Sequence, residues 1–290
     1  MDEFITHFLL CNIVISIIIG IFLVSKWILK NTLTSRMQYN LWYFLLVLLL
    51  TPFFPVQSKQ FPDLFSWLNH VIISPAFQTD QNKTVVSPAT LSNSSDWMNE
   101  FTISVNSSTP AIIRSILLCV WIAGMFVMLV LVLKSSLQLR SLKRSALPLQ
   151  NTTICKLYKQ CLFEMKITRN IPIYSTAFLK TPIITGIFKT RIYMPIHLIS
   201  DHQETDVRYI LLHELQHYKH KDSLANYLMF LTAILYWFNP IVWYALKEMR
   251  NDREIACDTS VLKMLDECDY EKYGNTLINF AEKISSSPFP

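Results

Sequence analysis

The stretch YILLHELQHYKHKD, residues Tyr209–Asp222, contains His213, Glu214 and His217 in the order H-E-x-x-H. On a helix, residues four positions apart lie on the same face, so both imidazoles can bind one cation. Zinc accepts two imidazoles and a carboxylate tetrahedrally and leaves a fourth position for water, whose pKa falls to about 7. Glu214 could take the proton of that water as it attacks a carbonyl. The alternative is a pair of surface histidines, because a five-residue pattern also arises by chance.

Two acidic residues downstream could complete such a site. In the segment MRNDREIACDTSVLKML, Glu254 and Asp258 are four residues apart in a strongly helical stretch. Glu254 could be the third metal ligand. Asp258 could accept a hydrogen bond from the outer nitrogen of a ligand imidazole, which fixes the orientation of the ring. The alternative is a solvated helix face on which both acids lie beside Arg250 and Arg253.

The composition predicts that membrane segments accompany this chemistry. Of 290 residues, 51% are hydrophobic and 16% are charged, and the mean hydropathy is positive, at +0.30. Three uncharged apolar runs are long enough to cross a bilayer as helices, and they span residues 4–25, 37–58 and 115–133. Asp2 and Glu3 precede the first run where a signal peptide would be basic, so we expect this run to be a retained anchor. Residues 1–134 are therefore predicted to form a transmembrane region.

The distribution of Lys and Arg predicts the orientation of these spans. Basic residues follow the first and third runs, at Lys26, Lys30, Arg36, Lys134, Arg140, Lys143 and Arg144. Residues 59–110 carry four acidic residues and two lysines. The positive-inside rule therefore predicts a multi-pass cell-membrane protein with the N-terminus and the loop 59–110 outside and the remainder cytoplasmic. The net charge of +5 then reflects topology rather than direct binding of nucleic acid.

Residues 135–290 have the pattern of a folded cytoplasmic domain. The short runs IPIYST, PIITG and TRIYMP are bounded by proline and glycine and predict strands of a small sheet. A helix over about Asp206 to His220 follows, with an apolar stripe spaced to pack on that sheet. The predicted fold is a mainly α membrane protein with three N-terminal transmembrane helices and a cytoplasmic α+β domain.

A fourth uncharged run, Ser223–Leu246, is also long enough to span a membrane. A single crossing would place His213 and Glu254 on opposite sides of a barrier about 30 Å thick, which excludes a shared metal ion. Proline disfavours helical geometry in the residue before it. We therefore predict a helical hairpin at the membrane, whose two helices meet at Asn239-Pro240 and make no complete crossing.

Together these segments carry a family resemblance. The elements are H-E-L-x-H, the following Asp222, an apolar stretch ending in W-F-N-P, E-x-x-C-D, the run KTPIITGIFKTRIYMP and the three-span layout. The chain resembles, over nearly its whole length, the bla/mec regulator family of integral-membrane zinc metallopeptidases, the β-lactam sensor-transducers of Gram-positive bacteria. The resemblance implies a gluzincin-like zinc metalloendopeptidase in which His213, His217 and Glu254 bind Zn²⁺ and Glu214 is the general base.

The resemblance also implies partners. It implies a peptidase that cleaves itself, a cytoplasmic transcriptional repressor, or both, and so induces β-lactam resistance, the repressor being cleaved directly or through self-cleavage. Membrane receptors of this kind often form homodimers. The full-length sensors continue into an external penicillin-binding domain with an acylated serine. No such segment follows Pro290 in this sequence, so we do not expect this chain alone to bind β-lactam.

Two other classes of protein remain open. One is a membrane zinc protease of the quality-control or prenyl-protein-processing kind, which shares H-E-x-x-H and a downstream Glu-x-x-x-Asp. The other is a non-catalytic membrane scaffold that lacks its sensor and needs no zinc. A peptidase also needs a donor to the oxyanion of its tetrahedral intermediate, and the sequence leaves four candidates: His202, Tyr218, His220 and Arg253.

Overall fold

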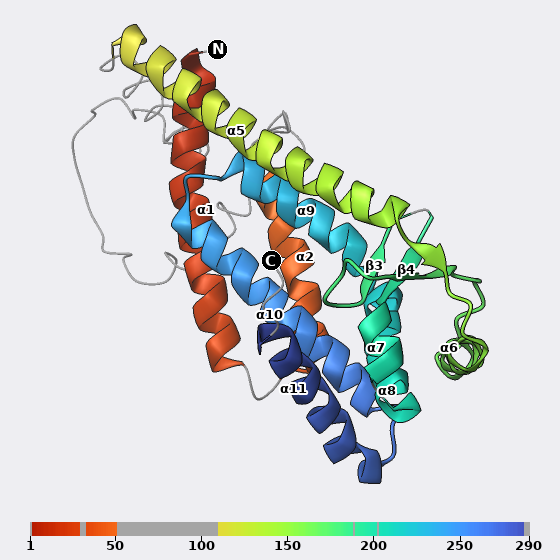
Figure 1. The fold of residues 1–290 in the computed structure, drawn as a ribbon. Helices are drawn as coiled ribbons and strands as arrows, with labels where there is room; N and C mark the ends of the chain where they lie inside the picture. The colour runs from red at the N-terminus through yellow and green to blue at the C-terminus, as the bar shows by residue number, and fades with distance from the viewer. Residues whose placement is uncertain (1, 30–32, 51–109, 188, 202, 287–290) are drawn as a thin grey trace, which may run out of the picture. The chain divides into compact units, whose positions relative to one another are not determined.

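The computed structural model describes residues 2–29, 33–50, 110–187, 189–201 and 203–286 (Figure 1). The predicted external loop 59–110 lies, except for its last residue, outside these ranges. The described part is mainly helical with one small sheet, as predicted. Contacts group the chain into two units, one formed by Met1–Ile18 with Leu48–Gly124 and the other by Ile19–Val47 with Met125–Pro290.

The apolar runs of the N-terminal part form the helices α1 (Asp2–Ile28), α2 (Ser35–Leu50) and α5 (Ala111–Arg144). Within the described residues, one helical stretch is both long and apolar enough to cross a membrane, and it lies in α5 at Ile112–Ser141. Two apolar helical stretches, at Asn12–Ile28 in α1 and at Asp222–Leu235, are shorter than this test requires. One span therefore has structural support, and the spans at 4–25 and 37–58 remain predictions.

The second unit contains a mixed four-stranded sheet. Its strands are β1 (Leu147–Pro148), β2 (Ile173–Thr176), β3 (Ile183–Thr185) and β4 (Arg191–Pro195), in the order β1-β2-β4-β3. Strands β2 and β4 are parallel and the other two pairs are antiparallel. The three predicted strands are confirmed, whereas β1 escaped prediction because two residues give no periodicity. Gly186 follows β3 with a φ of 102° and allows the chain to turn toward β4.

Helix α8 (Glu204–His220) carries the H-E-x-x-H segment and packs on this sheet. Its apolar stripe includes Val207, Leu211 and Leu215, which share one core with Ile192 and Met194 of β4. Helices α6 (Thr152–Glu164) and α7 (Ile196–Asp201) complete this region. Burial of the stripe fixes the rotation of α8 and thereby directs its polar face away from the sheet.

The fourth apolar run is broken as predicted. Helix α9 (Asp222–Leu235) and helix α10 (Pro240–Leu262) are separated at Asn239-Pro240. The Asn239 side chain caps α10 by accepting hydrogen bonds from the backbone N–H groups of Ile241 and Val242. Helix α10 packs on α8 and α9, and a short 3₁₀ turn (Glu267–Asp269) then leads into α11 (Tyr270–Ser286). The hairpin therefore returns the chain to the H-E-x-x-H helix.

Candidate metal centre

Three side chains from two helices converge as metal ligands would. The Nε2 atoms of His213 and His217, on α8, are 3.2 Å apart. The Oε2 atom of Glu254, on α10, lies 3.6 Å from the first nitrogen and 3.4 Å from the second. Ligands at the corners of a tetrahedron around zinc are separated by about 3.3 Å, which is about 1.6 times a bond of about 2.05 Å. The triangle therefore fits three corners of a zinc site.

Each imidazole is held from behind by a carboxylate. Asp222 Oδ2 lies 2.6 Å from Nδ1 of His217, and Asp258 Oδ1 lies 3.0 Å from Nδ1 of His213. These contacts engage the nitrogen that points away from the triangle, so both Nε2 atoms face the space that a cation would occupy. Carboxylates in this position orient ligand rings and raise their basicity.

The position of Asp222 depends on a break in the backbone. Lys221 has a φ of 60°, in the left-handed region, and ends α8 immediately before Asp222 begins α9. The reversal brings Asp222 beside His217, which is five positions earlier in the sequence. Helical periodicity alone does not predict this contact. The H-E-L-x-H…D pattern was the available signal for it.

A tyrosine from the last helix joins the site. The Tyr273 hydroxyl donates to Asp258 Oδ1 at 2.8 Å and lies 3.2 Å from Nδ1 of His213. Sequence reasoning missed Tyr273, because it lies beyond the helix that carries Glu254 and belongs to no spacing pattern with the ligands.

The site favours positive charge on its rings when no metal is present. Burial disfavours the charged imidazole, but hydrogen bonds to Asp258 and Glu254 outweigh it and raise the pKa of His213 to about 9. Burial likewise opposes the charged form of His217. Its contacts with Asp222, Cys257 and Glu254 outweigh this effect and raise its pKa to about 12. Burial would raise the pKa of Glu254, but both imidazoles hold it far below its ordinary value. A cation is therefore the charge that this arrangement accommodates.

Glu214 adjoins the triangle in a partly buried position. Burial raises the pKa of its carboxyl group above the ordinary value, and the neighbouring imidazoles oppose that rise. A raised pKa suits a group that must both accept and donate a proton near neutral pH.

Arg253 orients Glu254, the third candidate ligand. Its guanidinium donates to Oε1 of Glu254, from Nε at 3.2 Å and from Nη2 at 3.0 Å, and to Asn226 Oδ1 at 2.6 Å. The first contact directs the other carboxylate oxygen toward the imidazoles. Among the other oxyanion candidates, His220 contacts Gln216 at 2.8 Å, and His202 lies outside the described residues.

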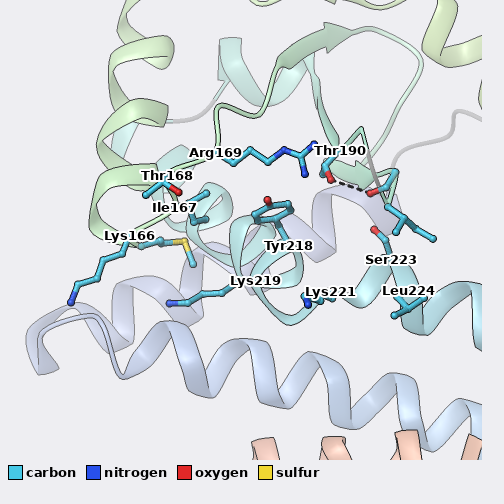
Figure 2. Close-up of a pocket in the computed structure, with 13 residues that line it drawn as sticks. Lys166, Ile167, Thr168, Arg169, Thr190, Tyr218, Lys219, Lys221, Ser223 and Leu224 are labelled. Atoms are coloured by element: carbon cyan, nitrogen blue, oxygen red, sulfur yellow. Dashed lines mark hydrogen bonds between the residues drawn. The ribbon is translucent and has the colours of Figure 1, made fainter. Parts of the chain in front are cut away.

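A separate cavity of about 550 Å³ lies at the end of α8 (Figure 2). Tyr218 and four cationic side chains, Lys166, Arg169, Lys219 and Lys221, contribute to its lining. None of the described lining residues is acidic, and the three candidate ligands and Glu214 do not contribute. Because none of these residues lines it, the cavity is distinct from the candidate centre, and its positive charge disfavours a metal cation.

Two imidazoles and a glutamate at this spacing are donors suited to a divalent metal ion. The family model described as BlaR1 peptidase M56 matches residues 6–289. The chain therefore belongs to the BlaR1 peptidase M56 family, which confirms the resemblance found in its motifs.

The names of curated relatives agree with this family. A protein named "Regulatory protein BlaR1" from Bacillus licheniformis is 30% identical over 279 residues, covering 96% of this chain and 46% of the relative. A "Methicillin resistance mecR1 protein" from Staphylococcus aureus (strain Mu50) is 27% identical over 283 residues, covering 94% and 46%. A BlaR1 from Staphylococcus aureus is 24% identical over 257 residues, covering 88% and 42%. The chain thus spans about half the length of these relatives.

Proposed function

We propose that this chain is a membrane zinc endopeptidase that acts in β-lactam signal transduction. The single observation that carries the proposal is the triangle of His213, His217 and Glu254, with edges of 3.2 to 3.6 Å. Membership of the M56 family supports a metallopeptidase, and the names of the relatives support a regulator of antibiotic resistance. A non-catalytic scaffold would have no need for this convergence of ligands and outer carboxylates.

The reaction assigns distinct tasks to residues of the site. His213, His217 and Glu254 would hold the zinc ion, which when bound supplies a polarised carbonyl and a more acidic water. Glu214 takes the proton from the attacking water and delivers it to the amine that leaves. Asp222 and Asp258 keep the ligand rings in place, and this removes the need for the site to reorganise during the reaction.

Strand β3 is the candidate binding edge for the substrate. It ends the order β1-β2-β4-β3, pairs only with β4 among the described strands, and lies against α8. A substrate in an extended conformation could add to this edge through main-chain hydrogen bonds. Its scissile bond would then lie over the helix that carries His213 and Glu214.

Membership of the family supports a physiological setting for this activity. We propose that the substrates are a cytoplasmic transcriptional repressor and the receptor chain itself. We also propose a multi-pass topology with the N-terminus outside and the peptidase domain cytoplasmic, which the basic residues that follow the apolar runs support. Cleavage on the inner side of the membrane would reach a DNA-bound repressor without transport of a signal molecule.

Glu214→Gln tests the chemistry separately from metal binding. Purified wild-type chain should contain one zinc per chain and cleave a co-expressed repressor in a chelator-sensitive way. Glu214→Gln should retain zinc and lose at least about 100-fold in cleavage rate, the lower range for loss of a general base. Glu204→Gln, an equal change at an exposed position of the same helix, should cleave normally. Normal cleavage by Glu214→Gln would refute the assigned base, and a metal-free wild type would favour the scaffold.

A further inference from the structure

A buried chain of hydrogen bonds runs from α2 to one of the candidate ligands. Tyr39, on α2, is 2% exposed, and its hydroxyl donates to Oδ1 of Asp222 at 2.7 Å. Asp222 is 3% exposed, and its other oxygen lies 2.6 Å from Nδ1 of His217. Hydroxyl, carboxylate and imidazole therefore form one continuous connection between residues that are far apart in the sequence.

Tyr39 has a specific effect on this carboxylate. A buried carboxylate requires hydrogen-bond donors, and Asp222 Oδ2 already contacts His217 and, at 3.6 Å, the Cys257 thiol. The Tyr39 hydroxyl occupies the opposite oxygen, Oδ1. A donor on each oxygen restricts rotation of the carboxylate group, which in turn restricts rotation of the His217 ring.

A second buried contact connects α1 and α2 to α10, the helix that carries Glu254. Asp252 lies two residues before Glu254 and is 5% exposed. Its carboxylate accepts from Lys26 Nζ of α1 at 2.8 Å and from Trp42 Nε1 of α2 at 2.6 Å. Lys26 also lies 3.4 Å from Glu248, one turn earlier on α10. The contact therefore holds α10 beside the same part of α2 that contacts Asp222.

We propose that α2 helps to position the candidate ligands of the metal centre. Tyr39 is a positioning residue for His217, and Trp42 together with Lys26 positions the helix that carries Glu254. This inference rests on the proposed function and adds a means of regulating it. A hydrogen bond of 2.7 Å is lost when its partners separate by about 1 Å. A displacement of α2 by that amount would release Asp222, loosen the His217 ring and lower the affinity of the site for zinc. Helix α2 thereby couples the position of an N-terminal helix to the state of the centre.

Tyr39→Phe is the test, because it removes one hydroxyl and keeps the ring. Zinc affinity would be measured on the full chain in detergent by competition with a chromogenic chelator. Tyr39→Phe should bind zinc about tenfold more weakly, at the lower end of the effects of outer contacts on metal affinity. The matched control is Tyr158→Phe, because Tyr158 is 4% exposed and donates to the backbone oxygen of Ile171 at 2.9 Å, away from the metal centre. This control should bind zinc as tightly as the wild type.

The visible absorption of the cobalt-substituted chain reports the geometry of the metal site, and a general loss of stability does not shift its bands. The cobalt bands should shift in Tyr39→Phe and match the wild type in Tyr158→Phe. Unchanged affinity and bands in Tyr39→Phe, or equal losses in both variants, would overturn the role of Tyr39. If the wild type itself binds neither metal, the proposed function fails, and this outcome is distinct from failure of the coupling.

Discussion

Replacement of Glu254 by glutamine tests the ligand triangle most directly. The change keeps the shape of the side chain and the oxygen that Arg253 contacts, but it removes the negative charge of a ligand that forms two of the three triangle edges. Zinc sites with four ligands are worth about 10–16 kcal/mol, so one ligand accounts for about 2.5–4 kcal/mol. Since about 1.4 kcal/mol is a factor of ten, zinc should bind Glu254→Gln between about 60 and 700 times more weakly.

The assay is chelator competition on the purified full chain, with zinc content measured in parallel. Glu204→Gln is the matched control, because Glu204 is exposed at the start of α8 and is not part of the triangle. The control should retain wild-type affinity. If Glu254→Gln binds zinc within about tenfold of the wild type, its carboxylate is not a ligand, and the triangle is a hydrogen-bonded cluster without metal.

Four further outcomes follow from described contacts. Asp222→Asn should weaken zinc binding about 10- to 100-fold by the same competition assay. Asp222 helps raise the pKa of His217 to about 12, so the metal-free ring is protonated at pH 7.5 and zinc affinity should rise with pH. Calorimetric titrations in buffers of different ionisation enthalpy should show that at least one proton is released per zinc ion bound. An imidazole of ordinary pKa would release only about 0.1 proton per zinc ion at this pH. Lys26→Met should lower the free energy of unfolding by about 3–5 kcal/mol by leaving a buried charge on Asp252, and Lys26→Met with Asp252→Asn should recover part of this in denaturant titrations. Asn239→Ala should cost about 1 kcal/mol by loss of the helix cap, measured in the same way.

Local rules were sufficient to predict the elements that present the ligands. The stripe of α8 follows from helical periodicity, and the break before α10 follows from Asn239-Pro240. Hydropathy alone would have predicted that Ser223–Leu246 is a fourth membrane span. The requirement that His213 and Glu254 share a metal ion predicted instead that this segment turns back toward the helix that carries His213. The spacing of Glu254 and Asp258 placed both on one helix face, where the structure has Asp258 at 3.0 Å from His213.

The contacts that surround the ligands could not be predicted in the same way. Asp222 reaches His217 only because Lys221 adopts a left-handed conformation, which a lysine in an otherwise helical sequence does not signal. Tyr39 and Asp222 are 183 residues apart, and no periodic pattern relates positions on separate elements at such a distance. Tertiary packing decides such contacts, so they require a structure.

The two candidate ligand imidazoles, those of His213 and His217, are supported in the same way by residues from opposite ends of the chain. Tyr39 donates to the carboxylate behind His217, and Tyr273 donates to the carboxylate behind His213. The hydropathy boundary at residue 134 separates Tyr39 from the centre that it contacts, so a domain defined as 135–290 would omit one of these two supports. It would also leave the buried Asp252 without Lys26 and Trp42. The unit that contains the candidate centre therefore includes Ile19–Val47, and we infer that this segment and the candidate centre belong to one cooperative structure.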